Sequence, residues 1–122
     1  MKDFSRSHYC GRVREDDINS KATAMGWVQT NRDMGGIIFI DLRDKTGVLQ
    51  VVFDSKNFNQ EQFSQIEGLR GEYVIAVSGT VRERDEETYN PKIPTGTVEL
   101  MAEDFRVLSK SNPLPFPDRK SV

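Results

Sequence analysis

Phe39 and Gln50 are the side chains of this sequence best suited to chemistry, because together they can recognise an unpaired nucleic-acid base. An exposed aromatic ring stacks on such a base, and an amide reads the edge of the base through hydrogen bonds. Both residues lie in the stretch GGIIFIDLRDKTGVLQVVF, from Gly35 to Phe53, with Arg43 between them. Two apolar runs flank the polar turn DKTG, which is the pattern of a β-hairpin. That hairpin would bring the ring, the amide and the guanidinium to one face.

The turn also predicts the register of the hairpin. One phase of the alternation carries the polar and aromatic residues and pairs Phe39 with Val52, Asp41 with Gln50 and Arg43 with Val48. The other phase is purely apolar and pairs Ile38 with Phe53, Ile40 with Val51 and Leu42 with Leu49. A slip of one residue would expose the apolar phase to water, so the pattern specifies the register strongly. We expect the apolar phase to be buried, with Phe39 and Gln50 on the opposite, more open face.

A helix is expected after the hairpin. Asn59 is a good N-cap and Gln62, three residues later, completes a capping box. Phe58 is placed to staple against Phe63, and Gly71 is the expected end of the helix.

Three further strands are expected at residues 22–32, 72–84 and 97–108. Gly26 would allow a bend or bulge in the first of them, and Trp27 is placed in the core. The order strand, strand, strand, helix, strand, strand predicts an all-β fold, a five-stranded Greek-key OB-fold barrel with one helix between strands three and four. We place this domain at residues 1–110. The tail 111–122, SNPLPFPDRKSV, is rich in proline and is read as an extended linker.

The composition limits the classes of function. The chain has 122 residues, with 36% hydrophobic and 30% charged side chains, which is the balance of one globular domain. No apolar run is long enough to span a membrane, and the N-terminus has no apolar signal core. The single cysteine excludes an internal disulfide and favours the cytoplasm. A net charge of −2 argues against a broad nucleic-acid coat but leaves room for a local site.

No catalytic or metal-binding motif is present in the sequence. His8 and Cys10 are too isolated for a metal site, which needs about four ligands with matching spacing. Asp41 and Asp44 flank Arg43, an arrangement that indicates charge balance more than magnesium binding. There is no nucleophile–base pair and no phosphate-binding glycine loop. We therefore expect a non-catalytic domain without a cofactor or metal of its own.

Five motifs follow one another along the chain: HYCGRVR at 8–14, GWV at 26–28, RDMGGIIFIDLRDKTGVLQVVFD at 32–54, GTVRERDEETYNP at 79–91 and TGTVEL at 95–100. In this order they resemble the N-terminal anticodon-binding domain of bacterial aspartyl-tRNA synthetase. Lysyl and asparaginyl synthetases carry related barrels, but FIDLRDKTGVLQVVFD is closer to the aspartyl type. The resemblance implies that the tail is the hinge to a class II catalytic domain. ATP and magnesium would bind that domain of a homodimeric parent enzyme, and this chain would bind the tRNA for aspartate without activating aspartate.

The resemblance also implies roles for individual residues. Phe39 matches an aromatic residue that stacks on the middle anticodon base, and Gln50 matches the amide that reads the edge of that base. Three arginines match positions that meet anticodon bases or nearby phosphates: Arg32, Arg82 and Arg84. Glu99 matches a carboxylate near a base edge. Thr88 stands where the family uses an asparagine, and Tyr89 and Asn90 are the neighbours that would substitute for it.

Other interpretations stay open at this point. A free-standing OB protein that binds single strands would carry several stacking aromatics, whereas only Phe39 and Tyr89 qualify here. A dimerisation barrel without nucleic acid would cover the face around Phe39 with another chain. Arg82 is also placed to pair with Glu99 across the sheet, which would make both residues structural.

Overall fold

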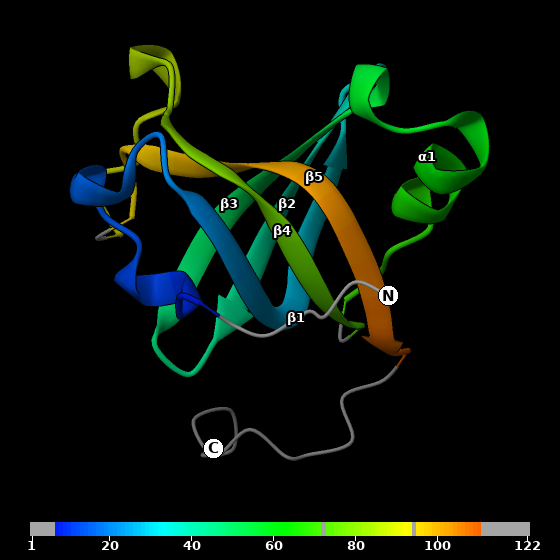
Figure 1. Cartoon of the computed structure of the whole chain (residues 1–122), viewed down its shortest axis with the longest axis horizontal. Helices are drawn as coiled ribbons and strands as arrows, with labels where there is room; N and C mark the ends of the chain where they lie inside the picture. The colour runs from blue at the N-terminus through cyan, green and yellow to red at the C-terminus, as the bar shows by residue number, and fades with distance from the viewer. Residues whose placement is uncertain (1–6, 72, 94, 111–122) are drawn as a thin grey trace.

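Strands with an alternating apolar pattern make up most of the computed structural model, which describes residues 7–71, 73–93 and 95–110. In this part of the chain the strands are β1 (Lys21–Asp33), β2 (Ile37–Asp44), β3 (Gly47–Asp54), β4 (Val74–Glu83) and β5 (Val98–Ser109). They close a barrel in the order β1-β2-β3-β5-β4. Figure 1 labels these strands in the structure. The predicted all-β OB-fold is confirmed.

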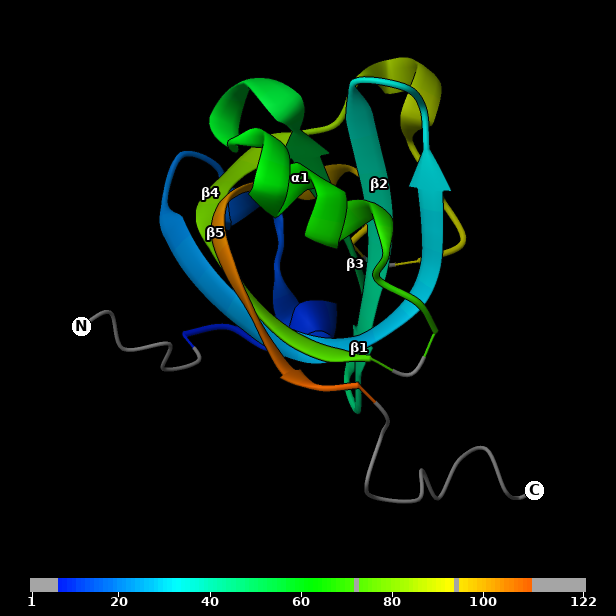
Figure 2. The ribbon, with the colours of Figure 1, turned by 90° about the vertical axis from the view of Figure 1, so that its right-hand side faces the viewer.

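The barrel closes where two strands distant in sequence meet. β1 is long enough to pair with both β2 and β4, and β4 pairs with β5, all antiparallel. Closure comes from a short parallel contact between β3 and β5, in which Val51 pairs with Leu100 and Val52 with Met101. The helix α1 (Gln60–Glu67) joins β3 to β4 and lies across one end of the barrel (Figure 2). Ile66 and Leu69 are buried in the core at this end.

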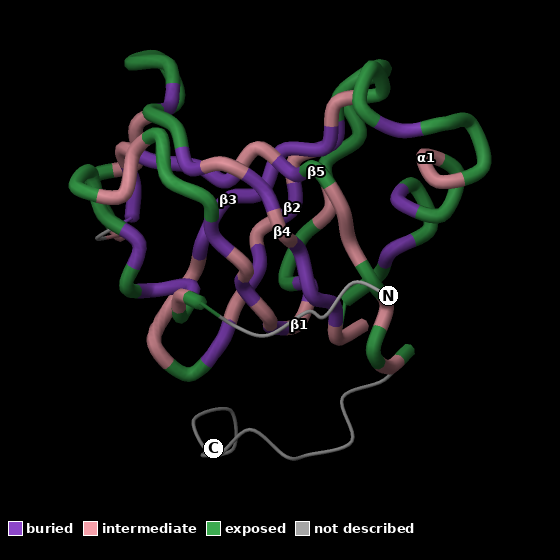
Figure 3. The backbone as a smooth tube through the Cα atoms, in the orientation of Figure 1, coloured by how far each residue is buried: buried purple, intermediate pink, exposed green. Residues whose placement is uncertain are grey.

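The register of the β2–β3 hairpin is confirmed at every predicted pair, from Ile38 with Phe53 to Arg43 with Val48. Residues of the apolar phase line the barrel interior and are inaccessible to solvent: Ile38, Ile40, Leu42, Leu49, Val51 and Phe53. Most buried residues lie along the strands of the barrel, whereas the residues of the helix and the connecting loops are largely exposed (Figure 3).

The expected bulge in the first strand lies elsewhere than predicted. The β1–β2 register shifts between Val28 and Thr30, not at Gly26. Gly26 instead allows a close backbone approach, because a Cβ there would lie 2.3 Å from the Arg43 carbonyl oxygen. Trp27 is only half-buried and lies outside the core, contrary to our placement.

The helix begins as predicted but ends earlier. Asn59 caps it by accepting a hydrogen bond from the Gln62 amide, and the Gln62 side chain accepts one from the Asn59 amide in return. The C-cap is Gly68 and not Gly71. Phe58 contacts the rings of Phe53 and Phe105, so it joins the helix entry to the barrel core.

The N-terminal segment is fastened to the β2–β3 turn. The 3-10 helix η1 (Cys10–Arg12) donates the Cys10 amide to Asp44 at 2.7 Å and the Gly11 amide to Thr46 at 2.8 Å. A second 3-10 helix, η2 (Glu15–Asp17), leads into β1. Among the described residues no helix is long and apolar enough to cross a membrane. The proposed linker at 111–122 lies outside the described residues.

Candidate nucleic-acid interface

A pocket of about 480 Å³ opens between the β1–β2 hairpin tip, β3 and the β4–β5 loop. It is lined by Arg32, Met34, Phe39, Gln50, Arg84, Glu87, Thr88, Tyr89 and Asn90. Most of the residues that the sequence nominated are therefore brought together in one place. A volume of this size lies in the range of pockets that bind small organic groups such as a base.

The strand register places the aromatic ring and the guanidinium side by side. Arg32 on β1 is the partner of Phe39 on β2, and the Arg32 Cζ lies 5.9 Å from the Phe39 ring centroid. A guanidinium at this distance interacts favourably with the ring. Phe39 is half-buried, so part of its ring remains open to the pocket, as stacking requires.

Gln50 departs from the expectation of an open face, because its residue is only 4% exposed. Its Oε1 accepts a hydrogen bond from the Arg32 Nη2 at 3.1 Å, and its Nε2 donates to the Glu99 Oε1 at 2.8 Å. The cause is the parallel contact of β5 with β3, which brings Glu99 beside the amide. The two contacts fix which end of the amide carries the oxygen, so the Gln50 amide has one fixed orientation in the pocket wall.

Glu99 and Arg82 are not among the described residues that line the pocket. They are cross-strand partners, and the Arg82 Nε donates to the Glu99 Oε2 at 2.6 Å. The cross-strand pairing that we held open is therefore present. Glu99 is 5% exposed and accepts from Gln50 and Arg82 on separate oxygens. Direct contact of either residue with RNA stays a prediction.

Arg84 follows the end of β4 and is buried, unlike the exposed Arg82 two residues before it. Its Nε donates to the Val98 carbonyl at 3.0 Å and its Nη1 donates to the Thr88 carbonyl at 2.9 Å. Burial lowers the pKa of the Arg84 guanidinium, and the carboxylates of Glu99 and Asp41 oppose that shift. Arginine stays charged even so. Arg84 thus fixes the start of the loop and adds positive charge to the pocket wall.

The three loop residues that the resemblance nominated, Thr88, Tyr89 and Asn90, all line the pocket. Thr88 donates its hydroxyl to the Asp85 carbonyl, and Asn90 accepts from the Lys92 amide at 3.0 Å. Tyr89 donates its hydroxyl to Glu83, and this hydrogen bond raises the pKa of the Tyr89 phenol to about 12. The phenol therefore keeps its proton to a higher pH than an ordinary tyrosine does.

Two lining residues were missed by the sequence reasoning, Met34 and Glu87. Met34 is 66% exposed at the hairpin tip, just before Gly35, whose φ is +101°. A large apolar side chain beside a glycine turn is the signal that would have indicated it. Glu87 lies in the 3-10 helix η4 (Glu86–Thr88), where one of several acidic residues carries no distinguishing signal.

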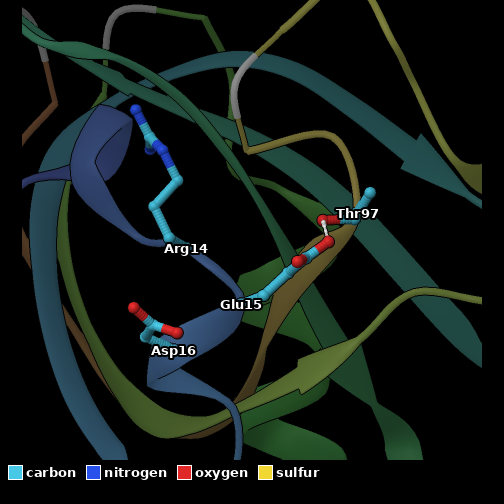
Figure 4. Close-up of a pocket in the computed structure, with 4 residues that line it drawn as sticks. All are labelled: Arg14, Glu15, Asp16 and Thr97. Atoms are coloured by element: carbon cyan, nitrogen blue, oxygen red, sulfur yellow. Dashed lines mark hydrogen bonds between the residues drawn. The ribbon is translucent and has the colours of Figure 1, made fainter.

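A smaller pocket of about 350 Å³ lies elsewhere, lined by Arg14, Glu15, Asp16 and Thr97 (Figure 4). The Thr97 hydroxyl donates to Glu15 at 2.9 Å, and the Arg14 guanidinium is bonded to the Gly11 carbonyl at 2.6 Å. The polar groups of this pocket are thus largely bonded to each other or to the backbone. In the described part of the chain, no cluster of three or more His, Cys, Asp or Glu side chains is suited to a metal ion.

Comparisons with known proteins agree with this geometry. The family model of the OB-fold nucleic acid binding domain named for the tRNA anticodon matches residues 22–108. The Aspartate--tRNA(Asp/Asn) ligase of Caldanaerobacter subterraneus is 47% identical over 121 residues, which are 98% of this chain and 20% of that protein. The ligase of the same name from Halothermothrix orenii is 50% identical over 113 residues, 93% of this chain and 19% of that protein. The chain thus spans about one fifth of the length of these relatives.

Solved structures give the same picture. Asparaginyl-tRNA synthetase from Pyrococcus horikoshii superposes with a TM-score of 0.76 at 27% identity, over 97% of this chain and 26% of that chain. The aspartyl tRNA synthetase from Entamoeba histolytica superposes with a TM-score of 0.78 at 19% identity, over 93% of this chain and 23% of that chain. The second likeness concerns the fold alone.

Proposed function

This chain belongs to the tRNA anticodon family of OB-fold nucleic-acid-binding domains, and from that premise we propose that it recognises the anticodon loop of the tRNA for aspartate. In this proposal it is the anticodon-binding part of an aspartate–tRNA ligase. The observation that carries the proposal is the pocket, which gathers an open aromatic ring, an oriented amide and two arginines around a space suited to one base.

Each group in the pocket has a distinct task. The Phe39 ring stacks on a splayed base, a contact that any base can make. The amide of Gln50 supplies the selectivity, because its donor and acceptor are fixed in place and match only one base edge. Arg32 and Arg84 favour the negative charge of the nearby phosphates.

The charge of the chain favours a local site over a long nucleic-acid track. The formal net charge is −2, and Glu87 adds a carboxylate to the pocket wall. A protein that coats single strands needs a basic groove with a series of stacking rings. Around this pocket the rings are those of Phe39 and Tyr89. Recognition of one short loop is the better match.

The relatives are called Aspartate--tRNA(Asp/Asn) ligase. This name favours the tRNA for aspartate as the partner and also allows the tRNA for asparagine. We place the OB domain at residues 1–110 and the linker at residues 111–122. In the whole protein we propose a catalytic domain that uses ATP and magnesium, a homodimer and a cytoplasmic location. The relatives support a further domain in the whole protein, because they are about five times the length of this chain.

Titration of the chain with RNA stem-loops tests the function. Loops carrying an aspartate-type and an asparagine-type anticodon are compared with a loop of scrambled sequence on the same stem. We expect the chain to bind the first loop more tightly than the scrambled one, and the asparagine-type loop shows whether both tRNAs are accepted. Equal affinity for all loops and for an unstructured single strand would favour a nonspecific OB protein. No binding to any RNA would contradict both readings.

A further inference from the structure

We propose that Asp41 is a positioning residue for RNA recognition, which holds the Arg32 guanidinium against Phe39 and Gln50. This inference rests on the proposed function and adds a residue to it. Asp41 does not line the pocket. It acts by fixing a side chain that does.

The contacts of Asp41 converge on one oxygen. Its Oδ2 accepts from the Arg32 Nη1 at 3.0 Å and from the Thr30 hydroxyl at 2.7 Å. The same guanidinium donates from its Nη2 to Gln50 at 3.1 Å, and its Cζ lies 5.9 Å from the Phe39 ring centroid. One planar group is therefore held by a carboxylate on one side and an amide on the other. Its position fixes the oxygen end of that amide.

A β-bulge in β1 creates this arrangement. Val28 of β1 pairs with Leu42 of β2. The next residue of β2, Asp41, pairs with Thr30 and not with Gln29, so β1 has one extra residue at this point. The extra residue reverses which positions of β1 point outward, as a bulge does. Without it Arg32 would pair with the buried Ile38 and lie in the inward phase. The bulge thus turns Thr30 and Arg32 to the outer face of β2, where Asp41 lies.

The exposure of the pair argues against a role in stability alone. The Arg32 side chain is 46% exposed and the Asp41 side chain is 20% exposed. Exposed ion pairs contribute little to folding, because water screens the charges and two side chains lose freedom. The Arg32–Asp41 pair therefore matters more for the position of the guanidinium than for the free energy of unfolding. When the carboxylate is lost, the guanidinium gains freedom, and Gln50 loses the fixed donor that orients its amide.

The test compares Asp41→Asn with a matched control, Glu103→Gln. Glu103 on β5 accepts from Lys21 and Thr80 much as Asp41 accepts from a cation and a threonine. Glu103, Lys21 and Thr80 are not among the described residues that line the pocket. We expect Asp41→Asn to weaken binding of the aspartate-type stem-loop about 3- to 5-fold, the factor that an exposed ion pair corresponds to. We expect Glu103→Gln to bind as the wild type does.

Selectivity separates positioning from simple destabilisation. In Asp41→Asn the ratio of affinities for loops that differ only at the middle base should shrink, because the oxygen end of the Gln50 amide loses its fixed donor and only the contact with Glu99 still holds the amide. In an Arg32→Ala background the same substitution should have no further effect on either affinity or selectivity.

An equal loss of affinity with and without Arg32, an unchanged ratio of affinities between the loops, or tighter binding by Asp41→Asn would each overturn the proposal. Thermal unfolding of each variant identifies any loss that comes from misfolding. Thr30→Val removes both the second donor to Asp41 and an acceptor of the Arg32 Nη1 at 3.3 Å, so it should reproduce part of the effect.

An RNA-free measurement keeps this proposal apart from the proposed function. NMR relaxation of the Arg32 side chain should show an ordered guanidinium in the wild type and a mobile one in Asp41→Asn. A mobile guanidinium in the wild type would overturn the positioning role, even if the chain selects the anticodon loop. If the wild type shows no preference for that loop, the proposed function fails whatever the NMR shows.

Discussion

The amide of Gln50 donates to the buried carboxylate of Glu99 at 2.8 Å, across a separation of 49 residues in sequence. Glu99 holds Arg82 with its second oxygen. The residue that we propose reads a base is thereby tied to β5, the strand that pairs with β3 to close the barrel. The proposed selectivity of the pocket thus depends on a carboxylate of a strand that is distant in sequence.

Replacing this carboxylate by an amide should destabilise the protein. In Glu99→Gln one end of the new amide is a donor, so it faces a donor of either Gln50 or Arg82 and leaves one of them unpaired. We expect the free energy of unfolding to fall by about 1–3 kcal/mol, the cost of an unsatisfied buried polar group. Chemical denaturation measures it, with the exposed Glu103→Gln on the same strand as the control. Equal unfolding midpoints for the two variants would contradict the prediction.

The ring of Phe39 should contribute through stacking. Phe39→Ala is expected to weaken binding of the anticodon stem-loop by about 1–3 kcal/mol, as loss of one base–aromatic contact does. Phe39→Leu keeps an apolar side chain without the aromatic face, so it should lose most of the same affinity. Fluorescence titration measures both, and thermal unfolding checks that the barrel is intact. If Phe39→Leu binds RNA as the wild type does, the ring does not stack.

The hairpin could be predicted from the sequence because its information is local. The turn at residues 44–47 and the period of two on both strands specify every pair, and all of them are observed. The N-cap of α1 is local too, since Asn59 and Gln62 are three residues apart. Features that depend on neighbouring side chains and a single turn are readable in this way.

Burial around the pocket could not be predicted, because it depends on distant segments. Gln50 is covered by β5 through a parallel contact that no local pattern encodes. Arg84 lies beyond the end of its own strand, and it is buried where its guanidinium donates hydrogen bonds to the carbonyls of Val98 and Thr88. The bulge at Gln29 carries no glycine, so composition gave no sign of it. The resemblance to a known family predicted more of the pocket residues than the local sequence patterns did.

The contact of Gly11 with the β2–β3 turn should tolerate no side chain. A Cβ at Gly11 would lie 2.0 Å from the Thr46 carbonyl oxygen, so the backbone of one segment must move. We expect Gly11→Ala to destabilise the fold by about 1–3 kcal/mol, as overpacking does. Gly36→Ala is the control, since its Cβ would meet Ser55 at an ordinary 3.5 Å. Thermal unfolding compares the two, and a Gly11→Ala protein as stable as Gly36→Ala would show that the segment adapts freely.

The phenol of Tyr89 should titrate late because of Glu83. The hydrogen bond to this carboxylate raises the pKa of Tyr89 to about 12, and Glu83→Gln should return it towards the ordinary value of about 10. Since the folded-state pKa lies above the unfolded one, the stabilisation from this group is complete below about pH 10 and is lost as the pH rises towards 12.

Ultraviolet titration of the phenolate signal measures the shift in the pKa of Tyr89, and Tyr89→Phe identifies which tyrosine gives the signal. The wild type should also lose more stability than Glu83→Gln over this alkaline range. Identical titration curves for the wild type and Glu83→Gln would show that Glu83 does not hold the ring at the pocket wall.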